Sequence, residues 1–283
     1  MPSNRLRPPR TLYRTNKSQL AFDLFWDWSV VFVACWIGYT SDILVGKLLA
    51  ILFIGTHLHR IAILGHDGAH FLFAKNRRLN DIVANLLCFY PLGGTVEGYR
   101  AWHFNHHRWV GTANDPEREI KQGHLYSIPF SRKRFSVVFL LDLVGLGIRE
   151  VVKQLWVIRP KQLKPLLGLI AFWVLSVAVL LTVGWHEVLV IYLVSIYPSF
   201  WAVFRIRSWT EHIGIQGTHR FDPGVFVRYF LFPYNTWCHY EHHKWPTISY
   251  QHLPAARECD TAVEILSTKQ LFDFFSGKSY ERR

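Results

Sequence analysis

The sequence has little cysteine and no motif that would put cysteine to its usual uses. Its four cysteines, Cys35, Cys88, Cys238 and Cys259, are far apart and form no CxxC pair. This spacing excludes a disulfide framework, a zinc knuckle and a rubredoxin or plant-type ferredoxin iron site. A GxGxxG nucleotide fingerprint and an HPGG haem motif are also absent from the sequence.

The chain is also poor in acidic residues and lacks internal boundaries. Asp and Glu number 20 against 32 Lys and Arg, which gives a net charge of +12 with histidines neutral. Such a balance suits either nucleic acid or an anionic membrane face. Half of the residues are hydrophobic and 16% are aromatic, which favours the membrane over nucleic acid. No Gly/Ser linker, repeat or low-complexity tract divides residues 1–283, so we expect a single domain.

Four apolar stretches are long enough to cross a bilayer, which needs about 20 mainly apolar residues. They are residues 21–39, 43–64, 166–185 and 188–204. Only short polar breaks separate the members of each pair, so the pattern predicts two helical hairpins. Two further stretches, residues 82–92 and 135–156, look too short or too charged to span. The second of these predicts an amphipathic helix at the membrane interface.

The basic residues predict an orientation for these spans. All but Lys47 and Arg60 of the 32 Lys and Arg lie before the first span, between the second and third spans, or after the fourth. These segments share one side if the chain crosses four times. The positive-inside rule makes that side cytoplasmic, so both termini are expected there.

Nine of the 15 histidines form a pattern typical of metal ligands. Residues three or four apart lie on one face of a helix, so each cluster can aim at one point. The nine histidines are His66 and His70 in HDGAH, His103, His106 and His107 in HFNHH, the isolated His212, and His239, His242 and His243 in HYEHH.

The predicted topology brings these histidines to one membrane face. His66 follows the second span directly, and two spans intervene between the HFNHH cluster and His212. Nine imidazoles exceed what one zinc site of four ligands needs, so the count predicts two metals. Imidazole suits iron, copper, nickel and zinc, and the spacing leaves the metal open. A metal transporter is disfavoured because residues 166–185 and 188–204 contain no ionisable residue that could line a pathway.

HDGAH, HFNHH and HYEHH, in this order around two predicted hairpins, resemble the three histidine boxes of the membrane fatty acid desaturase superfamily. The contexts HHRWVGTANDPE and HYEHHKWPTISYQHLP agree, and the resemblance covers residues 43–254. It implies an all-α integral membrane protein with a cytoplasmic helical cap. It also implies two non-haem iron ions, held by the nine histidines, that activate oxygen on the cytoplasmic side. His212 matches the extra ligand that these enzymes place before the third box.

Three carboxylates neighbour the proposed ligands, and each has two interpretations. Asp67, Glu211 and Glu241 can orient a metal-bound histidine by accepting its second N–H. Alternatively, each forms an ion pair with a nearby arginine. The sequence does not decide between the two interpretations.

The resemblance implies an oxidoreductase that uses molecular oxygen on a lipid substrate. The first interpretation is desaturation of a fatty-acyl lipid. The alternative is a hydroxylase or ketolase of the same superfamily acting on a lipid or carotenoid, because HYEHHKWP also resembles the third box of carotenoid ketolases. Since the chain has no haem, ferredoxin or nucleotide motif, we expect a separate electron donor, ferredoxin or cytochrome b5-like. A basic surface suits an acidic donor.

Overall fold

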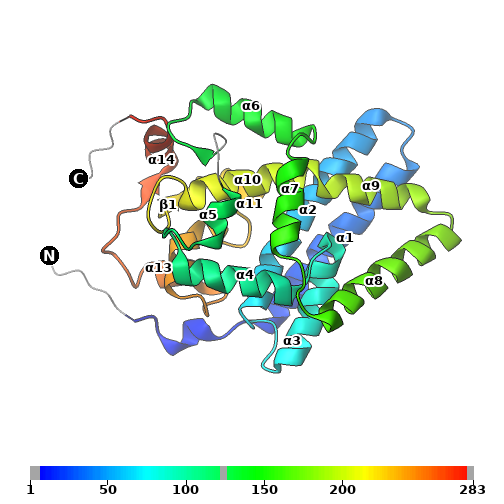
Figure 1. The fold of residues 1–283 in the computed structure, drawn as a ribbon, viewed down its shortest axis with the longest axis horizontal. Helices are drawn as coiled ribbons and strands as arrows, with labels where there is room; N and C mark the ends of the chain where they lie inside the picture. Colours follow the sequence, from blue (N-terminus) through cyan, green and yellow to red (C-terminus); the bar gives the residue numbers. More distant parts are fainter. Residues whose placement is uncertain (1–6, 122–125, 279–283) are drawn as a thin grey trace. The chain divides into compact units, whose positions relative to one another are not determined.

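The computed structural model describes residues 7–121 and 126–278, and these are mostly α-helical (Figure 1). The chain forms two compact units. Unit 1 combines residues 1–16, 104–140 and 205–283, and unit 2 combines residues 17–103 and 141–204. The boundary between the units falls inside three helices, α4 (Val96–Trp109), α6 (Arg132–Leu143) and α10 (Pro198–His212).

Four helical segments of the described chain are long and apolar enough to cross a membrane. They are α1 (Lys17–Thr40), α2 (Leu44–Ala69), α8 (Leu163–Thr182) and the run His186–His212, which joins α9 (His186–Ile196) to α10. The prediction of four apolar helices of spanning length is confirmed. α1, α2 and the run His186–His212 extend beyond the predicted apolar stretches, whereas α8 begins three residues earlier than predicted and ends at Thr182. The arrangement as two hairpins below a cytoplasmic cap stays a prediction.

In unit 2, buried polar contacts join the span helices. The Asp27 carboxylate of α1 accepts a hydrogen bond from Arg60 Nε of α2 at 2.7 Å, and it lies 2.8 Å from His57 Nδ1. Pairing of this kind is how ionisable side chains are tolerated inside a membrane. Gly55 lets α2 approach α10 closely, since a Cβ there would lie 2.0 Å from Ser199 Oγ. Asp27, His57 and Arg60 therefore join α1 to α2.

The two shorter apolar stretches form broken helices. Residues 82–92 fall across α3 (Arg77–Ala84), the π-helix η2 (Asn85–Phe89) and the 3-10 turn η3 (Tyr90–Leu92). Residues 135–156 are divided between α6 and α7 (Ile148–Val157). The prediction of a single amphipathic helix over residues 135–156 is wrong. Gly145 adopts a left-handed φ of 89° and turns the chain between α6 and α7.

Unit 1 is built around an aromatic core. Phe130 lies between Trp209 and Phe275, with ring centroids 5.3 and 5.0 Å away. A two-residue parallel pair, β1 (Phe221–Asp222) and β2 (Leu266–Ser267), adds a small strand element that the all-α prediction did not include. The other elements are η1 (Arg10–Tyr13), α5 (Pro116–Ile120), α11 (Val225–Leu231), η5 (Thr236–Cys238), α12 (His239–Lys244), η6 (Tyr250–His252), α13 (Leu253–Arg257) and α14 (Thr268–Phe275).

Candidate metal centre

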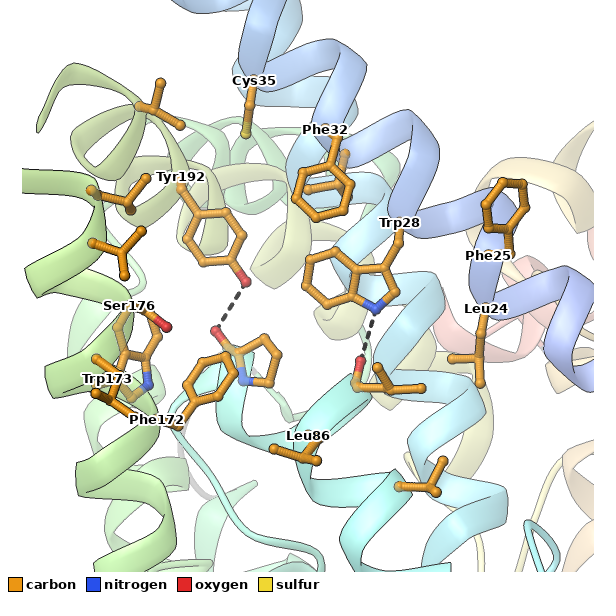
Figure 2. Close-up of a pocket in the computed structure, with 18 of the residues that line it drawn as sticks. Leu24, Phe25, Trp28, Phe32, Cys35, Leu86, Phe172, Trp173, Ser176 and Tyr192 are labelled. Atoms are coloured by element: carbon orange, nitrogen blue, oxygen red, sulfur yellow. Dashed lines mark hydrogen bonds between the residues drawn. The ribbon is translucent and has the colours of Figure 1, made fainter. Parts of the chain in front are cut away.

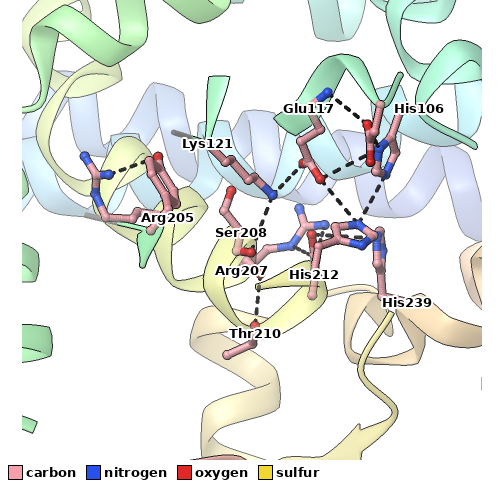
Figure 3. Close-up of polar contacts among 12 residues, drawn as sticks. His106, Glu117, Lys121, Arg205, Arg207, Ser208, Thr210, His212 and His239 are labelled. Atoms are coloured by element: carbon pink, nitrogen blue, oxygen red, sulfur yellow. Dashed lines mark hydrogen bonds and ion pairs between the residues drawn. The ribbon is translucent and has the colours of Figure 1, made fainter. Parts of the chain in front are cut away.

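Four histidines of unit 1 converge on one point. His106 comes from α4, His212 from the end of α10, and His239 and His243 from one face of α12. Nε2 of His212 lies 3.2 Å from that of His106 and 2.9 Å from that of His239. Nε2 of His243 lies 3.1 Å from that of His239. Figure 3 shows His106, His212 and His239 turned toward one another.

In two of these rings Nδ1, the nitrogen that does not join the cluster, lies at hydrogen-bond distance from an oxygen acceptor. His106 Nδ1 lies 2.9 Å from the carboxylate of Asp115, and His212 Nδ1 lies 2.8 Å from the carbonyl of Gly217. A neutral ring that donates from Nδ1 carries a lone pair at Nε2. With both rings neutral, the two Nε2 atoms that face each other at 3.2 Å are both acceptors, and a cation between them would stabilise this arrangement.

The spacing of the cluster also fits a metal ion. A metal–imidazole bond of about 2.1 Å places two ligands at a right angle about 3 Å apart. The Nε2 separations of 2.9 to 3.2 Å match this value. The donor set and its geometry therefore fit a metal ion held by four imidazoles.

Burial favours the neutral, metal-binding form of His239 in this cluster and of the neighbouring His107. The pKa of His239 lies well below its usual value because the ring is desolvated and faces His243. Desolvation, together with the neighbouring His106, lowers the pKa of His107 to about 4. Desolvation also acts on His106, but Glu117 and Asp115 outweigh it and raise its pKa.

Glu117 is a second buried carboxylate at this cluster. Its Oε2 lies 3.6 Å from His212 Nε2 and 3.7 Å from His106 Nδ1. Its Oε1 lies 2.5 Å from Lys121 Nζ (Figure 3). Burial alone would raise the pKa of Glu117, but Lys121 and the histidines hold it well below the usual range. Glu117 is therefore ionised and contributes negative charge beside a site suited to a cation.

Asp115 and Glu117 are held in place by a helix start. Asp115 caps α5, where its Oδ1 accepts from the backbone N–H of Glu117 at 2.9 Å and Pro116 occupies the first turn. Both carboxylates also line a polar cavity of about 390 Å³ that His212 reaches. The sequence prediction did not single out either carboxylate, although the quoted run HHRWVGTANDPE contains both.

The remaining predicted histidines lie in two groups. In unit 1, His107 Nε2 lies 2.9 Å from His242 Nε2. In unit 2, His70 Nε2 lies 3.0 Å from His103 Nε2, and the His66 ring centroid lies 4.5 Å from that of His103. Each group again places imidazole nitrogens at ligand spacing.

Residues around HDGAH hold the unit 2 group in place. Tyr99 stacks on His103 with ring centroids 5.1 Å apart. Arg100 Nε donates to the carbonyl of Ala69 at 2.7 Å, which fastens α4 to the end of α2. Asp67 is buried, and its Oδ1 lies 4.0 Å from His66 Nδ1, beyond direct hydrogen-bond reach.

The other two predicted carboxylates lie beside arginines. Glu241 is fully buried and accepts from Arg220 Nε at 2.7 Å and from Arg257 Nε at 3.0 Å. Glu211 accepts from Arg207 at 2.6 and 2.9 Å, and its Oε2 lies 3.8 Å from His239 Nε2. The geometry of Glu241 fits the ion-pair interpretation. Glu211 pairs with arginine and also lies near a candidate ligand.

Comparison with known proteins identifies the family of this chain. The family model described as fatty acid desaturase matches residues 43–263, which include all nine candidate histidines. The search of curated proteins returned no match. Since the matched region covers well over half of the chain, the protein belongs to the fatty acid desaturase family.

Proposed function

We propose that the protein is an oxygen-dependent oxidoreductase that desaturates a fatty-acyl lipid. Two iron ions would be held by His66, His70, His103, His106, His107, His212, His239, His242 and His243. The observation that carries the proposal is the convergence of four imidazole Nε2 atoms. In two of these rings, Nδ1 is hydrogen-bonded to an oxygen acceptor, so Nε2 is the nitrogen that faces the cluster. Membership of a lipid-oxidising family supports the reaction class, and the choice of iron rests on it.

The nine ligands divide between two metals in this proposal. His106, His212, His239 and His243 would hold one ion. The other five histidines are the candidate ligands of the second ion.

The chain's own residues have specific tasks in this scheme. When bound, the iron supplies the oxygen chemistry that removes hydrogen from an unactivated carbon chain. Asp115 and the Gly217 carbonyl would orient the His106 and His212 rings so that each presents Nε2. Glu117 would offset the positive charge of the site, and Lys121 would hold Glu117 in place. Burial of these groups excludes bulk water from the reacting centre.

The alternative reaction is hydroxylation or ketolation by the same centre. The phrase HYEHHKWP favours it, and a lipid or a carotenoid would then be the substrate. The outcome depends on where the substrate carbon lies relative to the metals. Product analysis separates the two reactions, because desaturation removes two hydrogens whereas hydroxylation adds one oxygen.

The topology and partners of the protein belong to the same proposal. The four spans would form two hairpins in one domain of residues 1–283, with both termini and the metal centre in the cytoplasm. The charge asymmetry of the sequence supports this orientation. Electrons would come from a separate ferredoxin or cytochrome b5-like protein.

The proposal is tested by expressing the protein in a host and analysing its lipids by mass spectrometry. We expect new species two mass units lighter than a host lipid, dependent on oxygen. A His239→Ala variant should abolish them, whereas the His219→Ala control should not. Species heavier by one oxygen would instead support the hydroxylase, and unchanged lipids and carotenoids would contradict the proposal.

A further inference from the structure

The polar cavity of about 390 Å³ in unit 1 leads from the protein surface to the four-histidine cluster. Its outer part is lined by three exposed residues, Thr112, Arg118 and Gln216. Its inner part is lined by the buried Glu117 and Tyr126 and by His212. One wall of the cavity is therefore a ring that also belongs to the candidate metal centre.

Two turns that are distant in the sequence form much of this cavity. One turn follows α4 at residues 111–115, and the other follows α10 at residues 213–217. The turns pack closely, since a Cβ on Gly111, whose φ is 74°, would lie 2.6 Å from the backbone nitrogen of Gly217. The carbonyl of Gly217 also binds His212 Nδ1. The turn that shapes the cavity thus also orients a candidate ligand.

The lining of the cavity suits water. Glu117 lies at the inner end, where it pairs with Lys121 on one side and approaches His106 and His212 on the other (Figure 3). A carboxylate and an ammonium are strong hydrogen-bond partners for water. A water molecule takes up about 30 Å³ in the liquid, so the cavity has room for roughly a dozen.

A larger cavity in unit 2, of about 1010 Å³, has a different character (Figure 2). Its aromatic wall includes Trp28, Trp173 and Tyr192, whose polar atoms donate to carbonyl oxygens in the segment 87–91 at 3.0, 2.8 and 3.1 Å. The rings therefore present mainly hydrocarbon to this cavity, and apolar cavities tend to stay dry. Of the two cavities, the polar one is suited to carry protons.

The proposed reaction consumes protons as well as electrons. Desaturation of a –CH2–CH2– unit by O2 takes two electrons from the donor protein and two protons from water, and it yields –CH=CH– and two water molecules. Hydroxylation takes the same electrons and protons and yields an alcohol and one water molecule. His106 and His239 are buried, so protons and product water must cross the protein to reach or leave the centre.

We propose that the polar cavity of unit 1 carries these protons inward and the product water outward. The inference rests on the proposed function for the reaction, but the hydration of the cavity does not depend on it. Protons would pass along a row of hydrogen-bonded water molecules. Glu117 and Lys121 would anchor the inner end of this row, and Gln216 lies at its mouth.

Radiolytic hydroxyl-radical footprinting of the purified, metal-loaded chain tests the hydration without relying on turnover. Tyr126 is the reporter, because it is buried and lines the cavity, and Trp209 is the buried control outside the lining. We expect label on Tyr126 and little on Trp209. Gln216→Phe plugs the mouth and should reduce the Tyr126 label several-fold. Asn114→Phe adds the same bulk at an exposed residue outside the lining and should leave the label unchanged.

Turnover measurements test whether the water row carries protons. Gln216→Phe and a second plug, Ile215→Phe, should each lower kcat several-fold without raising KM for the lipid, and should enlarge the solvent deuterium isotope effect. Melting temperatures show that the variants are folded. An unlabelled Tyr126, or plugged variants with unchanged kcat, would overturn the inference. A labelled Tyr126 in a protein that oxidises no lipid would refute the proposed function, and with it the proton role, but leave the water passage standing.

Discussion

Replacing Asp115 with asparagine isolates the effect of one orienting carboxylate. Its Oδ1 lies 2.9 Å from His106 Nδ1, and its Oδ2 accepts from the backbone N–H of Gly111 at 3.1 Å. Asparagine keeps one acceptor oxygen but replaces the other with an NH2 group. This NH2 group would face a second donor, the N–H of His106 or of Gly111. The side chain is only 7% exposed, so water cannot replace the lost interaction. Both the charge and one hydrogen bond are therefore removed from the His106 site.

The magnitude follows from the role of such partners. Loss of a carboxylate that orients a metal-bound histidine typically costs about 10- to 100-fold in metal affinity, or about 1.4 to 2.8 kcal/mol. Asp67→Asn should act differently, because Asp67 lies 4.0 Å from His66 Nδ1. We expect the loss of metal affinity to be smaller in Asp67→Asn than in Asp115→Asn.

The assay is competition for the bound metal by a chelator of known affinity, with turnover measured separately. Asp222→Asn is the control, since Asp222 is exposed and pairs with Arg228. The melting temperature of the metal-free protein shows whether folding has changed. Unchanged metal affinity in Asp115→Asn, or an equal loss in Asp222→Asn, would refute the reasoning.

Three further predictions follow from the site and the fold. His212→Ala should lose iron and activity, whereas His219→Ala, whose ring bonds the Ile213 carbonyl, should keep both; the reverse ranking in an iron assay contradicts the ligand assignment. Glu241→Gln removes the charge shared by two buried arginines, so thermal unfolding should show a loss of about 3–5 kcal/mol, and an unchanged melting temperature would argue against this pairing. A reporter fused after Arg283 should be active only in its cytoplasmic form, and activity on the opposite side would refute the proposed topology.

The sequence predicted the features of the molecule that repeat or extend along the chain. The spans were predictable because an apolar run of bilayer length has few alternative structures. The helical spacing of HYEHH predicted that His239, His242 and His243 would aim at one point. His239 and His243 do share one cluster, but His242 faces His107 instead. The helix ends were less predictable, since α10 continues through charged residues to His212.

The partners of the histidines depend on tertiary folding and could not be assigned from spacing. Asp115 reaches His106 because a turn after α4 reverses the chain, and no periodicity encodes that return. Glu241 sits next to His242 in sequence, yet its carboxylate faces Arg220 and Arg257, which are distant in the chain. Adjacency in sequence was therefore a weaker guide than the three-dimensional position of each charge.

The most direct test of the central claim is the metal content of the active, purified protein. Iron and zinc are counted per chain by elemental analysis, and oxygen-dependent lipid oxidation is measured on the same sample. The account predicts two iron ions per chain and loss of activity when iron is removed. One zinc ion per chain, retained with full activity, would contradict it.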